Sequence, residues 1–157
     1  ILEFVIKNKR ELLIVAPIAQ QVRAALLVNK VKGREWFRPF AGTILEEDVN
    51  EWFDLAGMDS SPFMMYAVDV KQNKIPSITH VDDTCRIQTV NKDQNENYYN
   101  IINEFKKLTG VPIVFNTSFN LAGEPLVETV NDAINVLLNS DIKYLYLPEI
   151  KLILEKK

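Results

Sequence analysis

A helix-like segment runs directly into a strand-like segment and then into a short polar one, and this succession constrains the fold most. Apolar residues recur at helical spacing over residues 98–108, and Gly110 ends the pattern. The apolar run at residues 111–115 has the length of a buried strand, and the polar sequence Asn-Thr-Ser-Phe-Asn (residues 116–120) follows it as a loop. Alternating helices and strands predict a mixed α/β fold, in which loops at strand ends commonly hold ligands.

The rest of the chain continues this alternation. Strands or extended segments are predicted at residues 12–15, 38–45, 63–70, 84–90, 143–147 and 150–154. Helices are predicted at residues 18–31, 46–53 and 133–138, the last with a cap formed by Thr129 and Asp132. Without repeats or linkers, the sequence predicts one mixed α+β domain over residues 1–157, with a twisted mixed sheet flanked by helices.

Composition excludes several classes of function. A net charge of −3 gives no overall attraction to nucleic acid or anionic membranes, so a phosphate site must be a local cluster. The apolar stretch at residues 12–19 is too short to span a bilayer, and no signal peptide is visible, so we expect a cytoplasmic protein. A start at Ile1 rather than Met suggests a fragment or a processed product.

Three cations lie close together where the helix at residues 18–31 meets the next extended segment: Lys32, Arg34 and Arg38. Arg offers a planar fork of donors and Lys a compact charge, and phosphate sites often use both. The alternative is a solvated basic helix end, where cations favour the helix dipole. Arg38 fits that alternative less well, because aromatic residues and Pro39 surround it.

The polar segment is the second candidate for ligand binding, through Asn116, Thr117, Ser118 and Asn120. The alternative is a polar loop that bonds only its own backbone. Nucleophilic catalysis is not expected, since His80 is the only histidine and Cys85 has no catalytic signature around it. A metal site made by this chain alone is not expected either, although a nucleotide can bring magnesium with it.

Several motifs occur in the order seen in one known family. They are Val-Lys-x-Arg-Glu-x-Phe-Arg-Pro-Phe-Ala, Ser-Pro-Phe-Met, His-Val-Asp-x-Thr-x-Arg-x-Gln-Thr-Val, Thr-Gly-x-Pro, Asn-Thr-Ser-Phe-Asn and Gly-Glu-Pro, at residues 31–41, 61–64, 80–90, 109–112, 116–120 and 123–125. Lys-x-Arg and Ser-x-Asn are the paired signatures of YrdC-like domains. The full succession resembles the C-terminal, YrdC-like part of O-carbamoyltransferases from nodulation-factor and antibiotic biosynthesis.

The resemblance implies that such a domain makes carbamoyl-adenylate from carbamoyl phosphate and ATP with Mg²⁺. A separate N-terminal transferase domain, which carries the metal site, then passes the carbamoyl group to a hydroxyl acceptor that the sequence does not identify. Lys32, Arg34, Arg38 and Arg86 match family positions that hold phosphate and the carbamoyl unit. Ser118 and Asn120, with Asn116 and Thr117 beside them, match positions at the nucleotide phosphates. Fixed cations stabilise the charge that develops when the α-phosphate is attacked, so no nucleophile is required.

The chain departs from the family pattern at two of these motifs and before them. Gly42 stands where the family has Pro, and Asp83 stands where it has Gly, which places a carboxylate beside a proposed phosphate site. The arginine-bearing stretch that the family places before Ile14 is not matched by residues 7–13. Two alternatives therefore stay open: a nucleotide-binding module without turnover, or a stand-alone YrdC-like protein related to threonylcarbamoyl-adenylate or RNA.

Overall fold

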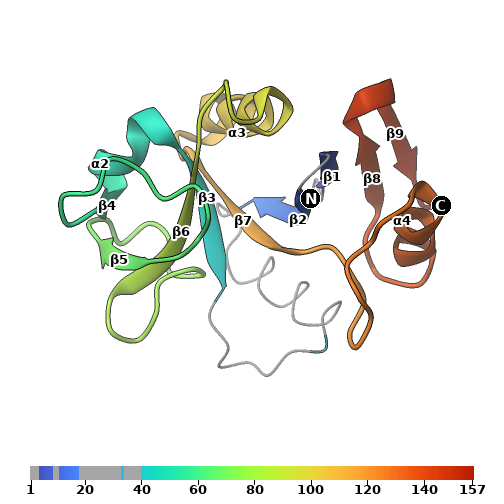
Figure 1. The fold of residues 1–157 in the computed structure, drawn as a ribbon, viewed down its shortest axis with the longest axis horizontal. Coiled ribbons are helices and arrows are strands. Elements are labelled where there is room, and N and C mark those ends of the chain that lie inside the picture. Colours follow the sequence, from blue (N-terminus) through green and yellow to red (C-terminus); the bar gives the residue numbers. More distant parts are fainter. Residues whose placement is uncertain (1–3, 9–10, 18–32, 34–39) are drawn as a thin grey trace.

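A computed structural model of the chain describes residues 4–8, 11–17, 33 and 40–157 (Figure 1). Its strands are β1 (Phe4–Asn8), β2 (Glu11–Pro17), β3 (Ala41–Leu45), β4 (Phe53–Asp54), β5 (Ala67–Val70), β6 (Thr84–Val90), β7 (Ile113–Ser118), β8 (Tyr144–Leu147) and β9 (Leu152–Glu155). Its helices are η2 (Glu46–Asp48), α2 (Val49–Trp52), α3 (Glu96–Thr109), α4 (Val130–Leu138) and η3 (Pro148–Ile150).

The described strands form one sheet of nine, in the order β4-β5-β6-β3-β7-β2-β1-β8-β9. The pairs β3–β6 and β1–β8 are parallel, and the other neighbours are antiparallel. This is the mixed α/β architecture that the sequence predicts. None of the helices in the described part of the chain has the length and apolar composition needed to cross a membrane.

Local signals account for both long helices. The side chain of Asn95 accepts a hydrogen bond from the backbone of Tyr98 at the start of α3, and Gly110 ends that helix with a left-handed φ of 75°. At α4, Thr129 and Asp132 form a reciprocal capping box. Each cap satisfies backbone groups that a helix end leaves without partners, so these boundaries are encoded locally.

The two faces of the central strands pack against different elements. On one face, Leu45, Val90 and Val114 are buried beneath Tyr98 and Ile102 of α3. The opposite face carries the largest core cluster, which joins β3, β6 and β7 to α2. A third cluster packs α4 against β8 and includes the buried ring of Phe119. Figure 1 shows α3 across one end of the sheet and α4 beside β8 and β9.

The packing around Gly42 explains why glycine replaces the proline of the family pattern at this position. It lies in the central strand β3, paired with Ile87 on one side and Phe115 on the other. A Cβ atom at this position would lie 2.5 Å from Cδ1 of Ile78 and 3.1 Å from Cγ2 of Ile113. In this chain the space that a side chain at position 42 needs is therefore filled by Ile78.

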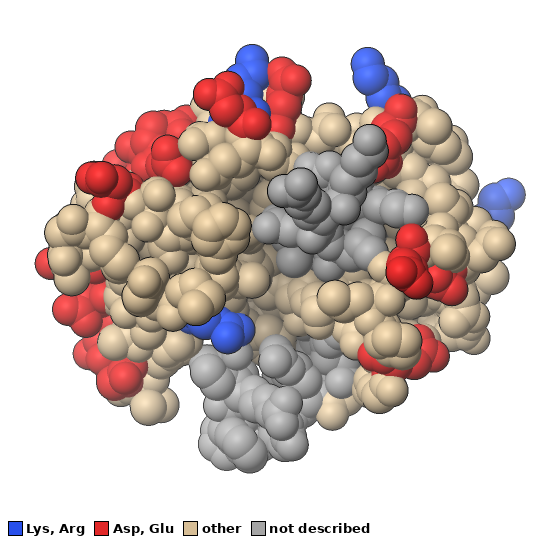
Figure 2. Space-filling view, viewed as in Figure 1, with Lys and Arg blue, Asp and Glu red and all other residues tan. Residues whose placement is uncertain are grey.

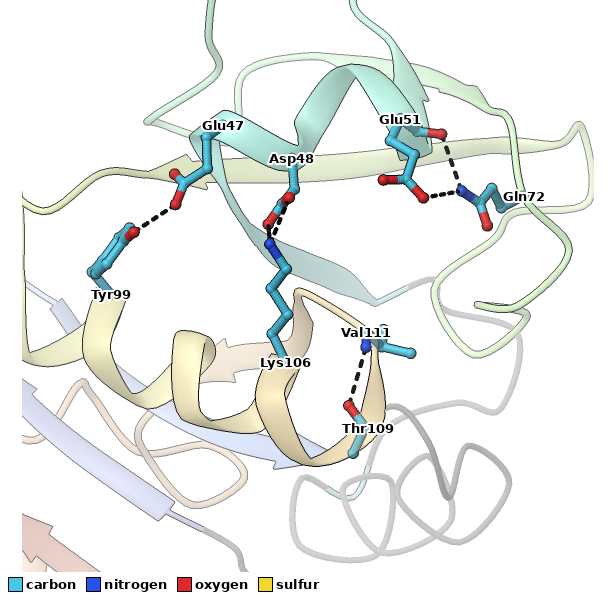
Figure 3. A network of polar contacts seen from close by, with 8 residues as sticks. All are labelled: Glu47, Asp48, Glu51, Gln72, Tyr99, Lys106, Thr109 and Val111. Atoms are coloured by element: carbon cyan, nitrogen blue, oxygen red, sulfur yellow. Dashed lines mark hydrogen bonds and ion pairs between the residues drawn. The ribbon is translucent and has the colours of Figure 1, made fainter.

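Polar contacts fix α3 to the acidic η2–α2 segment (Figure 3). Nζ of Lys106 lies 2.8 Å from Oδ1 and 2.8 Å from Oδ2 of Asp48. The hydroxyl of Tyr99 donates to Oε1 of Glu47 at 2.5 Å, and this hydrogen bond to a carboxylate raises the pKa of Tyr99. These contacts join residues more than 50 positions apart in the chain.

Several predicted elements are confirmed and others are corrected. The strand at residues 84–90 has the predicted bounds, and the helix that ends at Gly110 is confirmed. The strand predicted at residues 63–70 is wrong in its first half, because the strand β5 begins only at Ala67 and residues 63–66 do not join its pairing with β6. The helix predicted at residues 18–31 lies outside the described residues.

Candidate functional site

The candidate site lies on the α3-covered face of the sheet, beyond the end that the helix covers. Strand register places side chains there in successive rows across β6, β3 and β7. The first row beyond the apolar cluster contains Gln88, Thr43 and Val114, and the next contains Arg86, Ala41 and Asn116. The sheet therefore brings residues 41, 86 and 116 side by side, although they are far apart in sequence.

Three buried polar side chains from these two neighbouring rows form one hydrogen-bonded group, which we call the polar row: Thr43 and Gln88 of the first row and Asn116 of the second. Asn116 Nδ2 donates to Thr43 Oγ1 at 2.5 Å and lies 3.4 Å from Gln88 Oε1. Thr43 Oγ1 donates to Gln88 Oε1 at 3.1 Å, and Gln88 Nε2 donates to the Pro62 carbonyl at 3.1 Å. Satisfied polar groups in a buried position hold one another in a fixed orientation.

Among the predicted cations of the site, Arg86 belongs to the part of the chain that the structure describes. It is exposed, and strand pairing places it opposite Ala41 of β3 and Ala67 of β5. These two neighbours present only methyl groups beside it. Among the described residues no hydrogen bond or ion pair to its guanidinium is found, so its donors are available to an anionic ligand.

Ser118 is the last residue of β7 and lies on the same face as Asn116, and Asn120 follows two residues beyond the end of the strand. The Ser118 hydroxyl donates to Oδ1 of Asn120 at 2.9 Å, and Nδ2 of Asn120 donates to the Glu124 carbonyl at 2.6 Å. Between them, the ring of Phe119 is fully buried in the cluster with α4 and β8. The Ser-x-Asn sequence is therefore anchored at its middle residue while both polar residues remain near the surface.

The three cations Lys32, Arg34 and Arg38 lie outside the described residues, but Gly33 between the first two is described. Gly33 has a φ of 53°, and a Cβ atom on it would lie 3.4 Å from Cβ of Ala122. The backbone at Gly33 therefore lies against the loop that follows Asn120. Two motifs separated by more than 80 residues meet at this point.

The prediction for residues 116–120 as a loop is wrong for the first three. They belong to β7, because β2 continues to pair with them: Val15 with Asn116, Ile14 with Thr117 and Leu13 with Ser118. Side chains alternate along a strand, so Thr117 projects from the opposite face, together with Phe115. We therefore leave Thr117 outside the site.

The contacts of His80 and the burial of Cys85 do not suit either residue to act as a nucleophile. His80 Nδ1 lies 3.0 Å from Oγ1 of Thr84, whose proton goes to Asp82 at 2.7 Å, so Nδ1 is the donor to Thr84. That hydrogen bond from Thr84 lowers the pKa of Asp82. Cys85 is buried on the other face of β6, and desolvation raises the pKa of its thiol to about 12. No group of three metal-ligating side chains occurs among the described residues.

Thr43 and Gln88 belong to the site, although neither is among the candidate ligand-binding residues that the sequence predicts. Gln88 stands in the alternating strand at residues 84–90, on the same face as Arg86, and this alternation is the signal that identifies its side chain as part of the site. Thr43 gives no such signal. It is a short polar residue in an otherwise apolar strand, and its contacts depend on partners 45 and 73 positions away.

Comparisons with known proteins find a matching family and several relatives. The family described as Carbamoyltransferase C-terminus matches residues 9–154. Nodulation protein NolNO of Sinorhizobium fredii is 47% identical over 116 residues, which cover 71% of this chain and 17% of that protein. Nodulation protein NolO of Bradyrhizobium diazoefficiens is 48% identical over 116 residues, which cover 71% of this chain and 21% of that protein. The chain thus spans about a fifth of the length of these relatives.

The fold is also similar to a solved structure of full-length HypF in the phosphate- and nucleotide-bound form. The TM-score is 0.64, and the match covers 92% of this chain and 21% of HypF at 16% sequence identity. At that identity the likeness concerns the fold.

Proposed function

This chain belongs to the carbamoyltransferase C-terminal family, and we propose that it activates carbamoyl groups as carbamoyl-adenylate. In the proposed reaction, water cleaves carbamoyl phosphate into carbamate and phosphate. A carbamate oxygen then attacks the α-phosphorus of Mg²⁺-bound ATP, and the bond to pyrophosphate breaks. A partner domain with the metal site transfers the carbamoyl group to a hydroxyl acceptor.

The observation that carries this proposal is the position of Arg86. Its exposed guanidinium shares a row with Asn116 and lies on the same face of the sheet as Ser118. The close approach of Gly33 to Ala122 brings the residue that lies between Lys32 and Arg34 in the sequence next to the loop after Asn120. Converging cations stabilise negative charge on phosphoryl oxygens during displacement, and they need no covalent intermediate.

Within this proposal, Lys32, Arg34 and Arg38 bind phosphate groups alongside Arg86, while Ser118 and Asn120 contact the nucleotide phosphates. Asn116 belongs to the same site through the polar row. The HypF neighbour, solved with phosphate and nucleotide bound, supports a nucleotide as the ligand of this fold.

The test is exchange of labelled pyrophosphate into ATP, measured with and without carbamoyl phosphate, in the intact polypeptide that carries this chain. Arg86→Ala should reduce the exchange about 10- to 100-fold, since a hydrogen bond to a charged group contributes roughly 1.5–3 kcal/mol. Lys92→Ala is the matched control, because Lys92 is an exposed cation that pairs with Glu96 away from the site. Equal losses in both variants would remove Arg86 from the reaction.

The second candidate is a nucleotide-binding module without turnover, and Asp83 is the observation that favours it. This exposed carboxylate lies in the turn that leads into β6, three residues before Arg86. ATP binding by calorimetry, with no carbamoyl-dependent exchange even in an Asp83→Gly variant, supports this candidate. The RNA-related alternative has less support, because Figure 2 shows Asp and Glu prominent at the margins of the viewed face and only scattered Lys and Arg.

A further inference from the structure

We propose that Asn116 selects the carbamoyl group by accepting a hydrogen bond from its NH₂ group through Oδ1. Gln88 and Thr43 act as positioning residues that fix the orientation of the Asn116 amide. This inference rests on the proposed function, because it names the residue that distinguishes a carbamoyl group from an acyl group of the same shape.

The orientation of the polar row is determined from one end. The carbonyl oxygen of Pro62 can only accept, so the side-chain atom of Gln88 that faces it at 3.1 Å must be the donor Nε2. Oε1 of Gln88 then faces Thr43 and Asn116, and both must present donors to it. Asn116 therefore turns Nδ2 toward Thr43 and Gln88. If its Oδ1 took that place, it would lie against Oε1 of Gln88, and two acceptors would be in contact.

In this orientation, Oδ1 of Asn116 faces away from Thr43 and Gln88. The two partners of Nδ2, Thr43 and Gln88, lie one row of side chains nearer to α3 than Asn116, in the row that contains Val114. Oδ1 occupies the other corner of the amide, and no donor among the described residues contacts it. Asn116 as a whole is only 3% exposed, but its Oδ1 is not one of the fully buried side-chain atoms that lack a partner, so a ligand that brings a donor can reach it.

The neighbours of Asn116 in its row fit a ligand with an anionic end and an amide end. Ala41 lies between Asn116 and Arg86 and contributes only a methyl group. Backbones two strands apart are separated by about 10 Å, a span that the long Arg side chain shortens considerably. A small ligand can therefore place its phosphate at Arg86 and its NH₂ group at Asn116.

The test uses two stable probes that differ only at the selected group. Phosphonoacetamide carries an NH₂ group where acetonylphosphonate carries a methyl group. Calorimetry on the intact polypeptide should show tighter binding of the amide by about tenfold or more, because the methyl probe leaves Oδ1 without a donor. Gln88→Met should bring this preference close to unity, since Met neither donates to Pro62 nor holds the Asn116 amide.

Three further variants separate positioning from general destabilisation. Thr43→Val removes the second contact of the row and should also reduce the preference, whereas Thr43→Ser keeps the hydroxyl and should retain it. Thr89→Val is the matched structural control, because Thr89 accepts a buried hydrogen bond from the Ser61 backbone on the opposite face of β6. It should lower thermal stability and leave the preference unchanged. If Gln88→Met does not fold, the two Thr43 variants decide the matter.

The outcomes also distinguish this inference from the proposed function. Equal binding of both probes by the unaltered protein, or binding of neither, overturns the selection by Asn116. The same holds if the preference persists in Gln88→Met and in Thr43→Val. Pyrophosphate exchange without discrimination between the probes supports the proposed function and refutes the selection by Asn116. Discrimination between the probes without pyrophosphate exchange supports the selection by Asn116 and refutes the proposed function.

Discussion

The packing around Gly42 predicts a specific steric conflict that can be measured. Gly42→Ala would place a methyl group 2.5 Å from Cδ1 of Ile78, whereas carbon atoms in ordinary contact are about 3.5–4.0 Å apart. One of the two atoms must move by at least about 1 Å. Ile78 is 1% exposed and Ile113, on the other side, is fully buried, so neither has open space to move into.

The expected cost follows from two opposing contributions. Overpacking a buried site destabilises by about 1–3 kcal/mol. Replacing glycine by alanine within a strand recovers roughly 0.5–1 kcal/mol. The net loss for Gly42→Ala is therefore up to about 2.5 kcal/mol and is centred on about 1 kcal/mol, which corresponds to a fall in Tm of roughly 2–4 °C at the centre of the range for a chain of this size.

Denaturant unfolding in a double-mutant cycle is the assay. Ile78→Val deletes the Cδ1 atom in conflict and costs about 0.5–1.5 kcal/mol by itself. In that background, Gly42→Ala should cost close to nothing, which gives a favourable coupling of about 1 kcal/mol or more. Additive losses in the double variant would refute the reasoning, because the conflict would then not lie between these two side chains.

Three further predictions concern the turn before β6, the α3 ion pair and the buried thiol. Asp83 has a φ of 61°, a backbone conformation that favours glycine, so Asp83→Gly should raise the free energy of unfolding by about 0.5–1 kcal/mol. Asp82→Gly removes the hydrogen bond from the Thr84 backbone to the Asp82 carboxylate and should lower the Tm. Lys106→Met should destabilise by about 1 kcal/mol in urea, and Lys107→Met, the exposed neighbour, by less than about 0.5 kcal/mol. The raised pKa of Cys85, about 12 against an ordinary value of 9.0, predicts no reaction with an aromatic disulfide reagent until the protein unfolds. Since the folded state holds this proton more tightly, its contribution to stability is complete below pH 9 and is lost toward pH 12, a loss that Cys85→Ala should lack.

Elements with signals inside their own sequence were predictable. The α3 helix ends at Gly110 because a left-handed residue closes it, and α4 begins at the capping box of Thr129. The alternation at residues 84–90 identified both the strand and the face that carries Arg86. In each case the decisive groups lie within a few residues of one another, so a local reading of the chain is sufficient.

Elements that depend on a distant partner were predicted less well. Residues 63–66 are as apolar as a strand, yet Phe63 is 78% exposed and joins no ladder. Residues 116–118 are as polar as a loop, yet β2 pairs with them and they remain in β7. Composition reports what a segment can bury, whereas strand pairing depends on which other segment lies alongside it.

The sequence by itself determined the mixed fold, the end of α3, the cap of α4 and the motif residues that point to the carbamoyltransferase family. Only the tertiary structure decided that Asn116 shares a row with Arg86, that Thr117 faces away, and that Thr43 and Gln88 orient the Asn116 amide. The physical reason is the register of the sheet. A shift of one residue in any central strand would move its side chains to the opposite face, and the local patterns of β3 and β7 do not fix that alignment before the strands meet.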